Sequence, residues 1–126
     1  MKKTTNLVDS FRFALEGIYF VVRKNRNMRI HIVAAFLAIS LSYILKITIF
    51  EACLVGIAIL LVIVAEMINT VVEETVNLIT KEYKVEAKIA KDVSAGVVLA
   101  TATASVIIGI VVFLPHLVKI FAIIPR

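Results

Sequence analysis

The chain has 126 residues, of which 61% are apolar and 18% charged, and its mean hydropathy is +1.02. Soluble domains are about 45–50% apolar, so this composition argues against a soluble enzyme and against a disordered tail. A net charge of +5 is typical of some nucleic-acid-binding proteins, but the long apolar runs instead predict an integral membrane protein with no nucleic-acid partner.

Residues 6–24 are predicted to form an amphipathic helix that lies on the membrane surface. Apolar and charged side chains fall on opposite stripes, because each kind recurs at spacings of three and four residues. The apolar stripe consists of Leu7, Phe11, Leu15, Ile18 and Val22. The basic residues from Arg23 to Arg29 are then expected to meet anionic headgroups.

Three apolar runs follow and predict three transmembrane helices. The first covers residues 30–45, the second 48–80 and the third 93–114. The second run keeps its helical pattern beyond its apolar part, so we expect this helix to extend out of the membrane. Pro115 is expected to stop the third helix. The predicted fold class is therefore all-α, with one membrane domain over residues 1–126.

Basic residues are unevenly distributed along the chain. Seven of the 14 lysines and arginines precede Ile30 and four lie from Lys81 to Lys91, whereas Lys46 alone separates the first two apolar runs. Basic segments tend to stay on the cytoplasmic side of a membrane. The N-terminus and the loop before the third helix are therefore expected to be cytoplasmic.

Small residues recur four positions apart in the third apolar run. The first set is Gly96, Ala100 and Ala104, and the second is Ser105 and Gly109. Small residues at this spacing let helices approach closely, which predicts a packing face. Because three helices cannot enclose a large cavity, we expect an oligomer.

Polar residues of the second helix share one face, namely Glu66, Asn69, Glu73 and Asn77. A carboxylate at membrane depth costs about 2.5–3.5 kcal/mol on insertion scales, so Glu66 is a candidate functional residue. Lys91 and Asp92 precede the third helix at the same interface. Carboxylates bind Mg²⁺, an ammonium group neutralises phosphate, and a carboxylate can accept a hydroxyl proton. This set favours phosphoryl transfer. The less favoured alternative is that Glu66 reaches up to the interface and that Glu73, Glu74 and Asn77 form a solvated helix end.

Two runs carry a resemblance to a known family. They are Glu-Met-Ile-Asn-Thr-Val-Val-Glu from Glu66 to Glu73, and Ala-Lys-Asp-Val-Ser-Ala-Gly from Ala90 to Gly96. Supporting segments are Ser10 to Ala14 with Gly17, Arg26 to His31, and Phe113 to Pro115. Over nearly its whole length the sequence resembles the prokaryotic diacylglycerol kinase and undecaprenol kinase family. Arg29 to His31 and Phe113 to Pro115 are more similar to the undecaprenol kinases.

That resemblance implies a homotrimer of three-span protomers in the bacterial plasma membrane, with active sites shared at protomer boundaries. It implies transfer of phosphate from ATP, with Mg²⁺, to the hydroxyl of undecaprenol or diacylglycerol. Glu66 would be the catalytic base, and Glu73 would bind Mg²⁺ and the nucleotide. The other nucleotide-binding positions implied are Asn69, Asn77, Glu82, Tyr83, Lys84, Lys91 and Asp92.

Two positions depart from the family pattern. Asn25 stands where the second metal-binding glutamate is expected, and Asn77 where an aspartate is expected after Glu73. Asn25 is kept as the second predicted metal position, with weaker Mg²⁺ binding expected because the charge is lost. Glu16 and Glu74 are the nearest alternatives by charge.

Two other classes of protein are compatible with parts of this pattern. A catalytically impaired relative would bind lipid or nucleotide without efficient turnover, and the substitutions at Asn25 and Asn77 favour it. A subunit of an ion-translocating ring would use one intramembrane carboxylate. Glu66 lies too close to the cytoplasmic edge of the membrane for that role. A ring subunit would also leave Glu73, Lys91 and Asp92 unexplained.

Overall fold

The structure is a computed structural model that describes residues 6–123, and the side chains of residues 6–120. It contains four helices, α1 (Leu7–Lys24), α2 (Arg26–Leu45), α3 (Ile49–Ile79) and α4 (Val85–Ile123). No strand occurs within this part of the chain. The predicted all-α fold class is confirmed.

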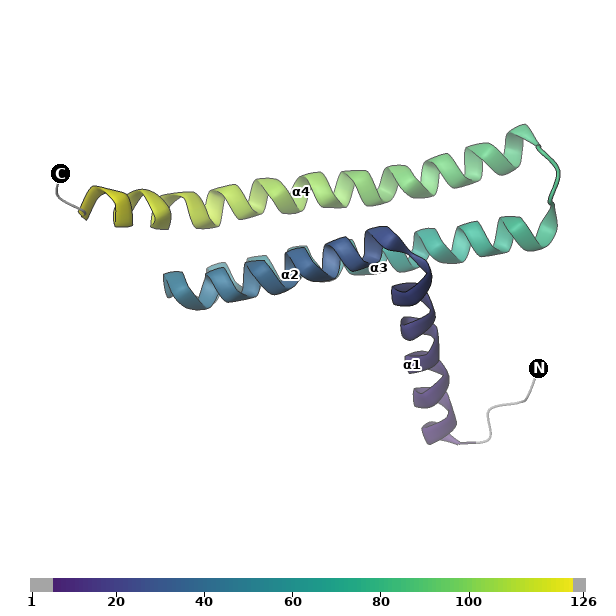
Figure 1. The fold of residues 1–126 in the computed structure, drawn as a ribbon, viewed down its shortest axis with the longest axis horizontal. Coiled ribbons are helices and arrows are strands. Elements are labelled where there is room, and N and C mark those ends of the chain that lie inside the picture. The colour runs from purple at the N-terminus through teal and green to yellow at the C-terminus, as the bar shows by residue number, and fades with distance from the viewer. Residues whose placement is uncertain (1–5, 124–126) are drawn as a thin grey trace.

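The helices form an elongated bundle from which α1 points away (Figure 1). Helices α3 and α4 run antiparallel and make the most extensive contact, and α2 packs mainly against α3. Helices α2, α3 and α4 are each long and apolar enough to cross a membrane. The chain is thus a multi-pass membrane protein with an additional N-terminal helix.

The three connections between helices have sequence-encoded caps. Asn25 separates α1 from α2, and its side-chain oxygen accepts hydrogen bonds from the backbone of Asn27 at 2.8 Å and Met28 at 3.4 Å. Lys46 ends α2 in a left-handed conformation with φ of 51°. Thr48 and Glu51 then form a reciprocal capping box that starts α3. The third connection, residues 80–84, is stabilised by the Thr80 hydroxyl, which accepts from the Glu82 backbone at 3.1 Å.

Helix α3 is longer than a membrane crossing requires. Its 31 residues span about 46 Å at 1.5 Å per residue, whereas the hydrocarbon core of a bilayer is about 30 Å thick. The C-terminal part of α3 and the loop to α4 extend past the point where α1 meets α2 (Figure 1). Polar side chains of this part of α3 can therefore lie outside the hydrocarbon.

Pro115 does not stop the last helix, so that expectation is wrong. Helix α4 continues through Pro115 to Ile123, and it begins at Val85, well before residue 93. A proline removes only one hydrogen bond from a helix, whereas ending the helix in an apolar segment would leave several carbonyls unpaired. Continuing is the smaller cost within lipid.

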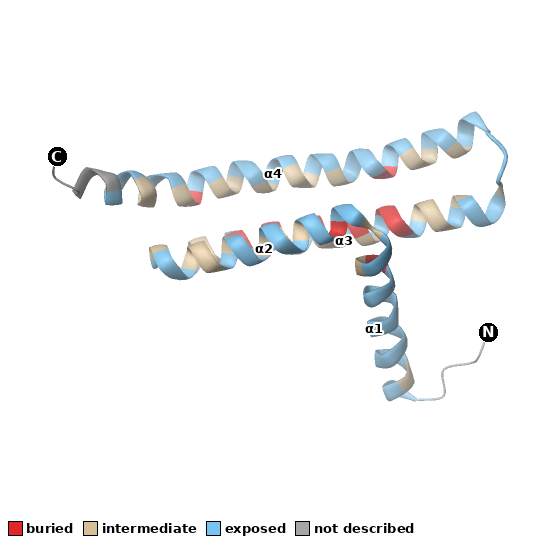
Figure 2. Ribbon diagram, viewed as in Figure 1, coloured by how far each residue is buried: buried red, intermediate tan, exposed pale blue. Residues whose placement is uncertain are grey.

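The buried residues concentrate on α3, on the face that meets its neighbours (Figure 2). Val55, Ala58, Val62 and Ala65 recur there at spacings of three and four, and Val112 of α4 is buried as well. Most other large apolar side chains of the described residues are exposed. An outward-facing apolar surface of this kind suits contact with lipid.

Candidate functional site

Glu66 is completely buried on the face of α3 that meets α2. Its Oε2 accepts a hydrogen bond from Nδ2 of Asn25 at 2.9 Å. Its Oε1 lies 3.3 Å from Nε2 of His31, close enough for an ion pair but without the geometry of a hydrogen bond. A buried carboxylate oxygen without an aligned donor is rare, so this atom marks a place where another group can bind.

Asn25 joins the hinge between α1 and α2 to the buried carboxylate. Its oxygen caps α2, while its Nδ2 donates to Glu66 and, at 3.3 Å, to the hydroxyl of Thr70. The Thr70 hydroxyl in turn donates to the backbone carbonyl of Glu66 at 2.9 Å. The hinge therefore holds one oxygen of the Glu66 carboxylate, Oε2, in place.

Asn69, one turn further along α3, is held between two helices. Its Oδ1 accepts a hydrogen bond from the buried Ser94 hydroxyl of α4 at 2.7 Å. Its Nδ2 donates to Oε1 of Glu73 at 3.2 Å. Asn69 thus orients Glu73 through its own tie to α4.

Two small hollows flank these residues. The central hollow has a volume of about 280 Å³ and includes Glu66 in its lining. The lining residues are Asn27, His31, Glu66, Asn69, Ala95, Val98, Leu99 and Ala102. The hinge hollow, about 190 Å³, is lined by Lys24, Asn25, Arg26, Asn27, Asn69, Thr70 and Glu73. Asn69 lines both hollows, so it lies between Glu66 and Glu73.

The hinge hollow brings together Asn25 and Glu73, the two positions predicted to bind metal. Glu73 presents a carboxylate that fits Mg²⁺, which commonly uses one or two carboxylates together with phosphate oxygens and water. The Asn25 oxygen is already occupied by the start of α2. No cluster of three or more histidine, cysteine, aspartate or glutamate side chains suited to a metal is present among the described residues. Glu73 has the chemistry of a Mg²⁺ ligand, and Glu73 and Asn25 both stay predictions as metal positions.

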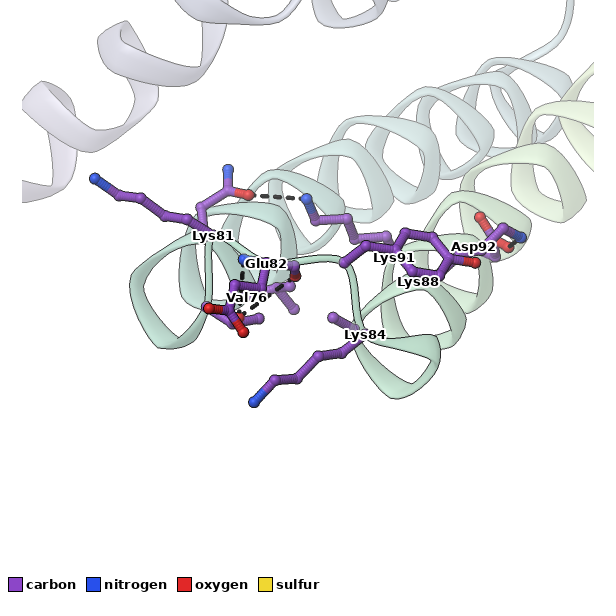
Figure 3. A pocket seen from close by; sticks show the side chains of 11 residues that line it. Val76, Lys81, Glu82, Lys84, Lys88, Lys91 and Asp92 are labelled. Atoms are coloured by element: carbon purple, nitrogen blue, oxygen red, sulfur yellow. Dashed lines mark hydrogen bonds and ion pairs between the residues drawn. The ribbon is translucent and has the colours of Figure 1, made fainter.

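A third and larger hollow, the loop hollow, lies where α3 turns into α4 (Figure 3). Its volume is about 720 Å³, and its lining is Val76, Asn77, Thr80, Lys81, Glu82, Tyr83, Lys84, Ala87, Lys88, Lys91 and Asp92. Four lysines and two carboxylates among these give the hollow an excess of positive charge. This charge suits a phosphorylated ligand.

Two of the lysines in the loop hollow have different partners. Lys91 donates a hydrogen bond from Nζ to Oδ1 of Asn77 at 2.8 Å, while Lys88 forms an ion pair with Asp92 (Figure 3). Since Asn77 is neutral, the charge of Lys91 is not cancelled. Lys91 is thus better suited than Lys88 to attract a phosphate.

The structure groups the predicted site residues into two places. Six of the predicted nucleotide positions line the loop hollow: Asn77, Glu82, Tyr83, Lys84, Lys91 and Asp92. Glu66, Asn69, Glu73 and Asn25 lie together nearer the hinge. About 16 Å of helix separates Glu66 from Asn77, because eleven residues rise 1.5 Å each.

Sequence reasoning assigned no role to several residues that contact this site. His31 and Thr70 touch Glu66 or Asn25, Ser94 holds Asn69, and Lys88 lines the loop hollow. The sequence could have drawn attention to them, because a histidine or a hydroxyl side chain inside an apolar helix is uncommon. Their contact partners, however, follow only from how the helices pack. Together, fold and site define a small multi-pass membrane protein with a carboxylate-containing polar site at one end of its helices.

Comparison with known proteins supplies the family. Residues 12–113 match the family described as prokaryotic diacylglycerol kinase. The chain is 35% identical to a diacylglycerol kinase of Synechocystis sp. over 116 residues. This aligned region covers 91% of this chain and 66% of that protein. It is 37% identical to an undecaprenol kinase of Bacillus subtilis over 108 residues. This aligned region covers 86% of this chain and 88% of that protein.

The chain belongs to the prokaryotic diacylglycerol kinase family. This confirms the resemblance found in the sequence. The family is one of kinases, enzymes that phosphorylate an alcohol.

Proposed function

We propose that the protein is an ATP-dependent and Mg²⁺-dependent lipid kinase that phosphorylates undecaprenol or diacylglycerol at the cytoplasmic face of the bacterial plasma membrane. The observation that carries this proposal is the buried Glu66, whose Oε1 lacks an aligned donor beside the central hollow. A carboxylate held in this way is suited to accept a proton from a hydroxyl.

In the proposed reaction the lipid hydroxyl oxygen attacks the γ-phosphorus of ATP and the bond to ADP breaks. The hydroxyl proton passes to the carboxylate of Glu66. Lys91, in the lining of the loop hollow, attracts the phosphates of ATP, because its charge is not cancelled by an acidic partner. Mg²⁺, when bound, would neutralise the phosphate charge, and Glu73 is the residue that would hold it.

The orientation and assembly of the protein are part of the same proposal. The basic residues beside the hinge and around the loop hollow support a cytoplasmic N-terminus and a cytoplasmic site. Homotrimeric assembly is proposed from the family resemblance, with each site completed at a protomer boundary. The largely exposed apolar surface of the protomer supports burial against other copies as well as lipid.

A second candidate is a relative with impaired catalysis. It is favoured by the hinge hollow, where Glu73 is the one carboxylate in the lining and the amide of Asn25 already caps a helix. Such a protein would bind ATP and lipid but release little phosphorylated lipid. Measuring nucleotide binding and product separately distinguishes the two candidates.

The decisive experiment replaces Glu66 by glutamine and measures phosphorylated lipid from labelled ATP, Mg²⁺ and either lipid in detergent. Glu66→Gln keeps an acceptor for Asn25 and is easier to bury than a charge, so helicity and assembly should not change. Turnover should fall about 10²- to 10⁴-fold, because a general base is lost. Glu51→Gln, at the opposite end of α3, is the matched control and should remain active. Near wild-type turnover of Glu66→Gln would show that Glu66 is not the base.

A further inference from the structure

His31 lies in the second turn of α2, and its side chain is 23% exposed. Its Nε2 is 3.3 Å from Oε1 of Glu66. Within the part of the chain that the structure describes, it is the one basic side chain within ion-pair distance of the Glu66 carboxylate. His31 is therefore the side chain best placed to influence the Oε1 atom of Glu66.

The two oxygens of Glu66 have different surroundings. Oε2 is fixed by Asn25, which is itself fixed by the start of α2. Oε1 lies 3.3 Å from Nε2 of His31, a distance that a hydrogen bond from Nε2–H could bridge once the imidazole is rotated into line, in the tautomer that carries the proton on Nε2. The oxygen that must meet a lipid hydroxyl is thus the one that depends on His31 for its orientation.

His31 also lies where a polar and an apolar space meet. It lines the central hollow, and it lines an apolar crevice of about 220 Å³ that runs between α2, α3 and α4 away from Glu66. Small residues give this crevice its width, including Ala34, Ala38, Ala58 and Gly109. Ala102 lines both spaces too. A hydrocarbon chain lying in the crevice would bring a terminal hydroxyl past His31 to reach Oε1.

We propose that His31 is a positioning residue for Glu66, which orients Oε1 through Nε2 at the junction of the apolar crevice and the central hollow. The proposal rests on the kinase reaction proposed above and adds a specific role within it. His31 acts on the carboxylate and not on the nucleotide, because it lies outside the lining of the loop hollow. Its loss should therefore affect turnover more than ATP binding.

The test compares three variants in the lipid kinase assay. His31→Leu removes the donor and should lower kcat about 10- to 100-fold, since a misplaced catalytic group costs up to about a hundredfold. The KM for ATP should change less than about twofold. His31→Gln restores an N–H donor at a similar reach and should recover most of the lost kcat. His116→Leu, a histidine replaced in the same way at the other end of the bundle, should keep wild-type turnover.

A second measurement separates positioning from a merely structural effect. If His31 acts through Glu66, adding His31→Leu to Glu66→Gln should lower the residual turnover by less than about twofold, because the group it orients is already lost. A full additional 10- to 100-fold loss in the double variant would overturn the proposal. So would a His31→Gln variant no better than His31→Leu, with both retaining wild-type helicity and assembly.

The outcomes also distinguish this inference from the function it depends on. An active wild-type protein whose His31→Leu variant is equally active would refute the role of His31 and leave the kinase proposal intact. A wild-type protein that binds ATP but phosphorylates neither undecaprenol nor diacylglycerol would refute the kinase proposal, and the inference with it.

Discussion

At the scale of single residues, the asparagine at position 77 changes what Lys91 can do. An aspartate there would form an ion pair with the Lys91 ammonium, whereas the neutral amide of Asn77 accepts its hydrogen bond and leaves the charge in place. Lys88, one turn earlier on α4, is instead paired with Asp92. The neutral side chain at position 77 therefore leaves the positive charge of Lys91 available to attract phosphate.

The first prediction compares these two lysines. Lys91→Ala should raise the KM for ATP about 10- to 100-fold and lower kcat as well, because hydrogen bonds to charged groups contribute about 1.5–3 kcal/mol. Lys88→Ala should have a smaller effect, since its charge is paired with Asp92. Steady-state kinetics over a range of ATP at saturating lipid measures both. Unchanged ATP dependence with weakened lipid dependence in Lys91→Ala would place Lys91 outside the nucleotide site.

At the scale of elements, the hinge between α1 and α2 is a single residue with several tasks. The backbone N–H of Asn25 donates to the Val21 carbonyl at 2.8 Å, its side-chain oxygen starts α2, and its amide nitrogen holds Glu66. The direction in which α1 leaves the bundle is thus coupled to the orientation of the buried carboxylate. A substitution here alters the cap and the site together.

The second prediction concerns the charge at this hinge. Asn25→Glu adds a carboxylate to the hollow that contains Glu73, so the Mg²⁺ concentration for half-maximal activity should fall severalfold. The control is Asn25→Ser, which keeps a good N-cap without adding charge and should leave the Mg²⁺ dependence unchanged. Both variants lose the Nδ2 group that donates to Glu66, so a drop in kcat common to both belongs to that lost hydrogen bond.

A contrary result would redirect the search for a second metal ligand. If Asn25→Glu needs as much Mg²⁺ as Asn25→Ser, position 25 is not at the metal. Glu16 and Glu74 would then be the next candidates by charge. In the protomer these two are engaged in ion pairs, Glu16 with Arg12 and Glu74 with Lys24.

Sequence reasoning predicts helices better than it predicts their contacts. The apolar periodicity of residues 6–24 and the apolar runs anticipate an N-terminal helix and three spans, because both signals are local. The error at Pro115 came from a rule for soluble helices that neglects the cost of unpaired carbonyls in lipid. The stripe on α3 was visible from spacing, but the residues that contact the Glu66 carboxylate, Asn25 and His31, lie 35 or more positions away in the chain. The periodicity of a sequence indicates local structure and cannot show which residues so far apart in the chain come into contact.

At the scale of the whole molecule, the protomer leaves much of α4 uncovered. The small residues of α4 divide into two faces: Ser105 and Gly109 turn inward, and the Ser105 hydroxyl donates to the Ala58 carbonyl of α3 at 3.1 Å. Gly96 and Ala100 face outward, and no atom from elsewhere in the protomer lies within 4 Å of a Cβ built on Gly96. Close helix packing at Gly96, where it occurs, would therefore have to come from another molecule, and the proposed trimer offers a second copy for it.

The last prediction uses this outward face to test the proposed trimer. Gly96→Leu should leave the protomer folded, because the added side chain enters open space, but it should block the close helix approach that small residues permit. Circular dichroism should thus be unchanged while cross-linking shows monomers and dimers. Gly96→Ala, which keeps the residue small, is the matched control and should retain more trimer. An unchanged trimer in both Gly96→Leu and Ala100→Leu would mean that this face meets lipid, and that the copies associate through another surface.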